Sequence, residues 1–77
     1  MKDLIETITR ALADTPEAVQ VLEIESANGR VLYEIKVDAN DMGKIIGRQG
    51  RVIKAIRTVA KACALRDGKK VLVELVE

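Results

Sequence analysis

The sequence predicts a single α+β domain with three helices and three short strands. Three observations lead to this prediction. Apolar residues recur at helical spacing over residues 4–12. An Asn28-Gly29 pair separates two strand-like runs, and both residue types tolerate the positive φ angles of a two-residue hairpin turn. A Gly-x-x-Gly segment at 47–50 then opens into a second helical pattern. With 77 residues there is room for one domain, and we expect it to span residues 1–77 with modest stability.

The first element is predicted to be an amphipathic helix that packs on one side. Its apolar positions, separated by polar residues, are Leu4, Ile5, Ile8, Ala11 and Leu12. The segment Asp14-Thr15-Pro16 should end this helix, because proline lacks the N–H that a helix interior needs.

Two strands are predicted around Asn28-Gly29. In the first, over residues 18–25, Val19 and Val21 point to one side while Leu22 and Ile24 point to the other, which indicates a bulge or a twist. In the second, apolar residues alternate with largely polar ones, so one sheet face is apolar and the other mostly wet. The apolar set is Val31, Tyr33, Ile35 and Val37. Residues 71–76 predict a last strand with Glu74 facing out.

The glycine segment is predicted to join two helices. Asn40 or Asp41 can cap a short helix that runs to about Ile46, and a longer helix follows from Arg51 to about Leu65. Along the longer helix the apolar and basic positions fall on different faces. The apolar stripe holds Val52, Ile53, Ile56, Val59, Ala60 and Cys63, and the basic face holds Arg51, Lys54, Arg57 and Lys61.

Residues 47–50 have the form of a phosphate clamp. Gly47 and Gly50 let the main chain turn sharply and approach a ligand without a Cβ in the way. The helix start that follows offers unpaired N–H groups to an anion. Arg48 and Arg51 add positive charge beside it, so this segment is the main candidate for a binding site.

The net charge of +1 conceals a basic half of the chain. Residues 44–70 hold nine Lys and Arg against the single acid Asp67, a net of +8, whereas residues 1–43 hold four against nine, a net of −5. A basic segment next to a phosphate clamp favours a polyanion as the ligand.

Composition argues against several other functions. The sequence has no histidine, no thiolate partner for Cys63 and no carboxylate pair with a reason to be buried together, so we expect no catalysis, no metal and no cofactor. The glycine spacing fits neither the dinucleotide fingerprint nor the P-loop. Tyr33 is the single aromatic residue, which excludes base stacking as in RRM sheets. We find no signal-peptide pattern and no bilayer-spanning apolar run, and therefore expect a cytoplasmic protein without a membrane partner.

The order of elements, with Ile-Ile-Gly-Arg-Gln-Gly-Arg-Val-Ile at 45–53 joining the later helices, resembles the KH domain of the type II arrangement. The segments at 16–19, 41–44 and 54–59 resemble the small bacterial stand-alone KH proteins of the KhpA family, over essentially the whole chain. This resemblance implies an α-β-β-α-α-β fold with a three-stranded mixed sheet and helices packed on one face. It also implies binding of single-stranded RNA, of which KH domains clamp about four nucleotides.

The resemblance also assigns roles to individual residues. The loop residues Gly47, Arg48, Gln49 and Gly50 would hold the sugar-phosphate chain, and nearby apolar and basic side chains would line the groove beside it. These are Lys44, Ile45, Ile46, Arg51, Ile53, Lys54 and Arg57. Family members are described as RNA chaperones and post-transcriptional regulators that act with a second KH-containing partner in control of cell length and wall growth.

A second interpretation is a protein-interaction or dimerisation module within a larger ribonucleoprotein assembly. The small size of the domain and the apolar segment at 19–24 favour it, since a partner could cover what the domain leaves exposed. We then expect a homodimer, formed through the face away from the glycine loop, or a heterodimer with another KH-containing protein.

Overall fold

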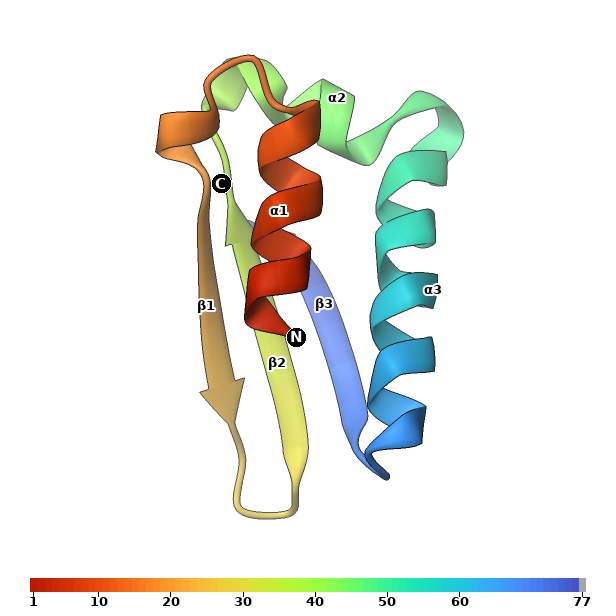
Figure 1. Cartoon of the computed structure of the whole chain (residues 1–77). Helices are drawn as coiled ribbons and strands as arrows, with labels where there is room; N and C mark the ends of the chain where they lie inside the picture. Colours follow the sequence, from red (N-terminus) through yellow and green to blue (C-terminus); the bar gives the residue numbers. More distant parts are fainter. Residues whose placement is uncertain (77) are drawn as a thin grey trace.

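The computed structural model describes residues 1–76, in which three helices lie over one face of a three-stranded sheet (Figure 1). The helices are α1 (Lys2–Leu12), α2 (Met42–Ile46) and α3 (Arg51–Arg66). The strands are β1 (Gln20–Glu25), β2 (Arg30–Lys36) and β3 (Lys70–Val76). Single 3-10 turns lie at Pro16–Ala18, Ala39–Asp41 and Arg48–Gly50. The α+β class and the element order are therefore confirmed.

The sheet is mixed, with the strands in the order β1-β2-β3. β1 pairs antiparallel with β2, and β2 pairs parallel with β3. Parallel neighbours cannot be joined by a tight turn, because the chain has to return to the starting end of the sheet. The return path here consists of α2, the glycine loop and α3, which places the loop at the end of the molecule opposite the β1–β2 hairpin (Figure 1).

The β1–β2 hairpin is where the sequence predicts it, but its turn is longer than the two residues predicted. The Ser26 N–H donates to the Arg30 carbonyl at 2.8 Å, so the connection has three residues, 27–29, rather than two. Gly29 alone of these takes a positive φ, of 81°. The β1–β2 pairing runs from Gln20 to Glu25 without a break, so of the two predicted alternatives, a bulge or a twist, the bulge is absent.

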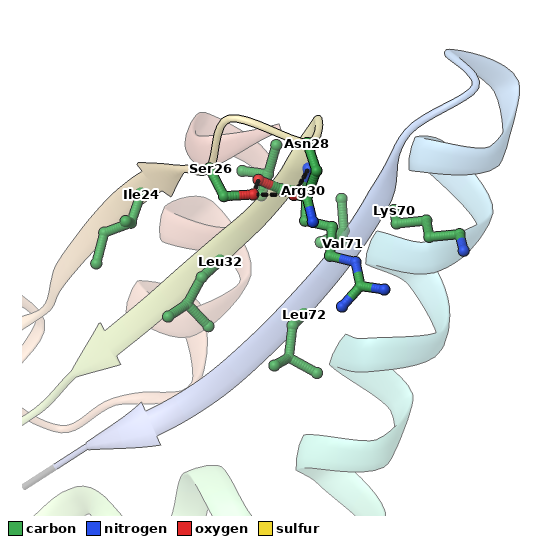
Figure 2. A pocket seen from close by; sticks show the side chains of 9 residues that line it. Ile24, Ser26, Asn28, Arg30, Leu32, Lys70, Val71 and Leu72 are labelled. Atoms are coloured by element: carbon green, nitrogen blue, oxygen red, sulfur yellow. Dashed lines mark hydrogen bonds between the residues drawn. The ribbon is translucent and has the colours of Figure 1, made fainter.

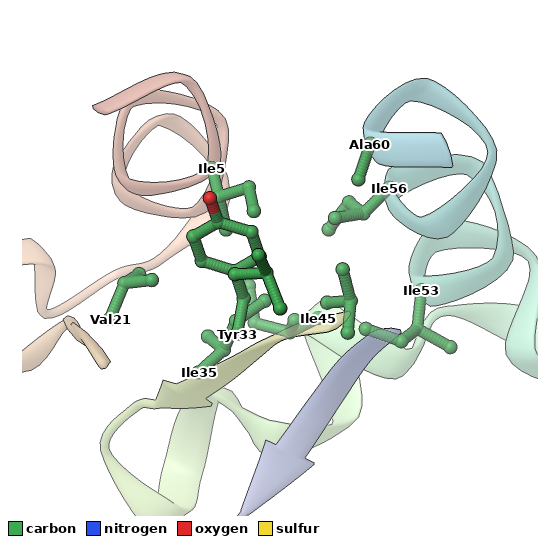
Figure 3. Packing of buried hydrophobic residues seen from close by; sticks show 10 residues of the cluster. Ile5, Val21, Tyr33, Ile35, Ile45, Ile53, Ile56 and Ala60 are labelled. Carbon is green, nitrogen blue, oxygen red and sulfur yellow. The ribbon is translucent and has the colours of Figure 1, made fainter. Parts of the chain in front are cut away.

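The core is aliphatic apart from Tyr33 and lies between the sheet and the helices (Figure 3). Ile5 of α1, Ile45 of α2 and Ile56 of α3 all contact the inner face of the sheet, where Tyr33 and Ile35 are buried. The Tyr33 hydroxyl donates to a carboxylate oxygen of Glu23, its partner on β1. Burial, together with this hydrogen bond, raises the pKa of Tyr33 well above its ordinary range.

The sheet covers less of the helices than their apolar patterns suggest. Leu4, Leu12 and Val59 were assigned to packed stripes, yet they remain 39%, 40% and 42% exposed. Between α1 and α3 lies a small apolar cleft of about 150 Å³, lined in part by Ile8 and Val52. A three-stranded sheet is too narrow to bury the full width of both helices. None of the helices within residues 1–76 has the length and apolar character needed to cross a bilayer.

Candidate nucleic-acid interface

The glycine loop turns by means of positive backbone φ angles. Gly47, which ends α2, has φ 76° and ψ 172°, and Gly50, which precedes α3, has φ 73° and ψ 15°. Gln49 between them is also left-handed, with φ 58° and ψ 26°. A left-handed residue other than glycine costs free energy, and such residues concentrate at functional sites. The loop conformation is therefore maintained by its surroundings rather than by local preference alone.

Packing requires glycine at position 47. A Cβ built there would lie 2.3 Å from Cγ2 of Val52 and 2.9 Å from its backbone nitrogen. Position 50 is different, because a Cβ there meets no atom within 4 Å. Within residues 1–76 no side chain caps the N-terminus of α3. The Gly50 N–H donates to the Gly47 carbonyl at 3.1 Å, and the Arg51 N–H donates to the Arg48 carbonyl. An anion at this point would be favoured by the remaining N–H groups of the first turn and by the helix dipole.

The polar side chains of the loop point into solvent. Arg48, Gln49, Arg51 and Lys54 are all exposed. A guanidinium nitrogen of Arg51 donates to the Gln49 side-chain oxygen at 3.3 Å, which ties the loop to the first turn of α3. The four polar side chains that the sequence predicts to contact RNA thus lie close to one another along the chain and are all exposed.

Lys44 lies just before the loop and is engaged by an acidic residue that the sequence reasoning did not single out. Its Nζ lies 2.6 Å from Oδ2 of Asp14, in the segment that follows α1. The Asp14 carboxylate raises the pKa of Lys44 above its ordinary value. Lys44 therefore places a positive charge near the loop, and in this structure that charge is paired with the carboxylate of Asp14.

Asp41 does not cap the short helix α2 through its side chain, contrary to one of the predicted alternatives. Its carboxylate is 1% exposed and accepts hydrogen bonds from the backbone N–H groups of Asp14 and Thr15, both at 3.0 Å. These two bonds hold the pKa of Asp41 below its ordinary value, with the nearby Lys44 adding to the effect. Asp38 instead caps the 3-10 turn before α2 by accepting from the Asn40 N–H at 2.9 Å. Asp41 consequently fixes the start of α2 to the end of α1.

The three predicted groove isoleucines have different environments. Ile45 is 0% exposed and Ile53 is 6% exposed, so both belong to the core (Figure 3). Ile46 is 39% exposed and offers apolar surface directly before Gly47. In the structure as it stands, Ile46 is the member of this set that presents substantial surface to a ligand.

Arg57 differs from the other basic residues of α3 because it is half-buried. Its Nε donates to the backbone carbonyl of Val73 on β3 at 3.0 Å. The guanidinium thus bridges α3 and the edge strand of the sheet. Sequence periodicity placed Arg57 on the basic face but gave no sign of this contact.

Two features of the described residues concern metal ligands and thiols. Across 1–76 no three His, Cys, Asp or Glu side chains are grouped closely enough to hold a metal ion. Cys63 is a free, partly exposed thiol on α3.

Comparison with known proteins places the chain in a family. Residues 2–75 match the family model described as KhpA/KhpB, KH domain. The chain belongs to this family. Relatives named RNA-binding protein KhpA include those of Clostridium acetobutylicum and Clostridium perfringens, each 51% identical over 99% of this chain and 100% of the relative. The KhpA of Aquifex aeolicus is 39% identical over 100% of this chain and 96% of the relative.

Two solved structures share the fold of this chain. Aquifex aeolicus Era bound to GDP·AlF4− matches 97% of this chain with a TM-score of 0.60 and 20% identity. Era in complex with MgGDPNP and nucleotides 1506–1542 of 16S ribosomal RNA matches with the same TM-score and 21% identity. The chain spans 30% of each Era chain, so the likeness concerns one KH-like part of a larger protein.

Proposed function

We propose that this protein is a non-catalytic, cytoplasmic RNA-binding protein that clamps single-stranded RNA at the glycine loop. The observation that carries the proposal is the loop itself, with three positive φ angles, a close Gly47–Val52 contact and an uncapped helix start beside exposed cations. Relatives covering the whole chain are named RNA-binding proteins, which supports the same ligand. Phosphate would bind to loop N–H groups and to Arg48, Arg51 and Lys54.

We further propose that the protein acts as an RNA chaperone and post-transcriptional regulator, with the link to cell length and wall growth carried by family resemblance. A single module contacts few phosphates, so its affinity is expected to be low. Weak, reversible contact suits a chaperone, because the RNA must be released after it refolds.

The test of the clamp is the double substitution Arg48→Asp with Gln49→Asp. Both side chains are exposed, so the fold is expected to persist while two carboxylates face phosphate at close range. A matched control is Asn28→Asp with Lys69→Asp, which changes the net charge by the same amount at the opposite end of the molecule (Figure 1). Loss of oligoribonucleotide binding in the loop variant alone supports the clamp. Equal binding by a folded loop variant and wild type refutes it.

A second candidate function is self-association through the sheet face that the helices leave open. Ile24, Leu32 and Leu72 form a row across the three strands, because Leu32 pairs with both other residues (Figure 2). Ile24 and Leu72 are 47% and 52% exposed, and the row borders an open depression of about 560 Å³. Apolar side chains gathered on one face in this way favour a protein partner.

The charges beside this row fit a second copy of the chain. On one side Arg30 pairs with Lys70, and on the other Glu34 pairs with Glu74. A two-fold axis through the row would set the basic pair of one copy over the acidic pair of the other, as an isologous interface requires. Another KH-containing protein with the same pattern would form the heterodimer.

Light scattering distinguishes this interface from association through the helices. Leu72→Lys on the sheet face is expected to leave monomer only, while Val59→Lys on α3 is expected to retain the dimer. A wild-type protein that stays monomeric at high concentration, or a dimer that Leu72→Lys leaves intact, would reject the sheet-face interface.

A further inference from the structure

Arg57 is held in a fixed orientation at the edge of the sheet. Its Nε–H is bonded to the Val73 carbonyl, and β3, which carries Val73, is the last strand in the order β1-β2-β3. One side of β3 therefore has no strand partner, and Arg57 approaches the strand from α3 on that side of the fold. A guanidinium is planar, so fixing Nε also restricts the plane of the two terminal nitrogens.

The terminal nitrogens of Arg57 remain available to a ligand. Within residues 1–76, the contact to Val73 is the one hydrogen bond or ion pair that its side chain makes. Arg57 is half-buried, yet none of the described buried side-chain nitrogens lacks a partner, so Nη1 and Nη2 reach the surface. They can present two parallel N–H donors to a ligand.

The position of Arg57 relative to the loop favours a base over a phosphate. It lies seven residues after Gly50 on the same helix, roughly 10 Å along the axis. Arg48, Arg51 and Lys54 lie in the loop or directly after it, and their side chains are exposed to solvent, where they can follow a phosphate backbone. Arg57 is instead held beside the free edge of β3 by its bond to Val73, so its two terminal N–H donors keep one direction, as the recognition of a base edge requires.

Resting on the proposed RNA binding, we propose that Arg57 selects bases that present two adjacent acceptors, namely O6 and N7 of guanine or O2 and N3 of cytosine. Adenine and uracil each place an N–H donor within the corresponding pairs, which would oppose one donor of the fork. The discrimination comes from Arg57, while the loop and its cations hold the backbone of any RNA sequence.

The experiment compares binding of the full-length protein to uridine heptamers that carry guanosine, cytidine or adenosine at the central position, with heptauridine as reference. Wild type is expected to bind either the guanosine probe or the cytidine probe at least about fivefold more tightly than it binds the adenosine probe and heptauridine. The guanosine and cytidine arms identify which acceptor pair is used. Equal affinity for all four RNAs overturns the inference, whereas failure to bind any of them overturns the proposed function instead.

Arg57→Lys keeps the charge and removes the fork, so it is expected to make the four affinities equal. Arg66→Lys, in the last turn of the same helix, is the matched control and should keep the preference. A preference that survives Arg57→Lys overturns the inference. If Arg57→Lys does not fold, the test is the change in chemical shift of the Arg57 Nε–Hε resonance when RNA is added to the wild-type protein. This resonance should shift further with the preferred probe than with heptauridine, and equal shifts reject base selection.

Discussion

Val52 occupies the space above the α-carbon of Gly47, since its Cγ2 lies 2.3 Å from the point where a Cβ would be. Gly47→Ala is therefore expected to destabilise the domain by about 2 kcal/mol or more, because the backbone must move and φ is already 76°. Urea denaturation measures the change. Gly43→Ala is the control, since a Cβ there meets nothing within 4 Å, and its effect should stay within about 1 kcal/mol. Equal effects at the two positions would contradict the packing argument.

RNA affinity should depend steeply on salt. Each phosphate contact on a single strand contributes about 0.7 to the slope of log affinity against log salt. Lys54→Gln is thus expected to weaken binding of all sequences alike and to reduce this slope by about 0.7. Fluorescence anisotropy between 50 and 200 mM salt, as a rough working range, measures both quantities. An unchanged slope would show that Lys54 does not contact a phosphate.

Release of Lys44 from Asp14 should strengthen RNA binding. The two side chains are exposed and 2.6 Å apart, so the pair contributes little to stability while occupying a cation near the loop. Asp14→Asn removes a carboxylate and frees that cation, and we expect a few-fold gain in affinity at low salt. Asp67→Asn, in the turn after α3, makes the same charge change far from the loop and serves as control. An equal gain from both variants would show that net charge alone is responsible.

The buried carboxylate of Asp41 should make stability sensitive to acid. Its pKa is lowered in the folded state, so its contribution is present above the unfolded value of about 3.9 and is lost as pH falls through the folded value. Asp41→Asn is expected to lower the urea midpoint at pH 7 and to flatten the fall in stability below about pH 4. A variant with the wild-type midpoint and acid profile would mean that the bonds to Asp14 and Thr15 are dispensable.

Tyr33 should make the stability of the domain sensitive to alkali. Its pKa is raised in the folded state, so its contribution is complete below the unfolded value of about 10 and declines as pH rises above it. Tyr33→Phe keeps the buried ring and loses the hydroxyl, at a cost of about 1 kcal/mol near neutral pH. Thermal denaturation from pH 8 to 11, a range set roughly by the tyrosine pKa, should show a smaller loss of stability in the variant. If stability falls equally with rising pH in the variant and in the wild type, ionisation of Tyr33 is not the cause of the fall.

The local pattern of the sequence was sufficient for the element order and for the position of the loop. Helical spacing identified α1 and α3, alternation identified β2, and the two glycines marked the break between α2 and α3. Each of these signals depends on neighbours within a few residues, where backbone geometry dictates which side chains share a face. The class of fold and the position of the candidate site follow from that short-range information.

Contacts between distant segments could not be obtained in this way. Asp41 reaches back to Asp14 and Thr15, and Arg57 reaches forward to Val73, because the packed sheet and helices bring these residues together. Sequence periodicity assigns a residue to a face but does not say how far that face is covered, which explains the exposure of Leu4. The hairpin turn was misjudged because strand register, rather than the Asn-Gly pair alone, fixed its length.

The parallel pairing of β2 and β3 restricts how the chain can vary over evolution. The glycine loop is part of the only connection between these two strands, so an insertion or deletion at 47–50 would disturb α2, α3 and the strand alignment together. The hairpin at 27–29 lies at the other end of the molecule and joins two strands whose pairing does not depend on loop length in the same way. Extra segments and fusion points are therefore better tolerated at the hairpin, which leaves the clamp geometry unchanged.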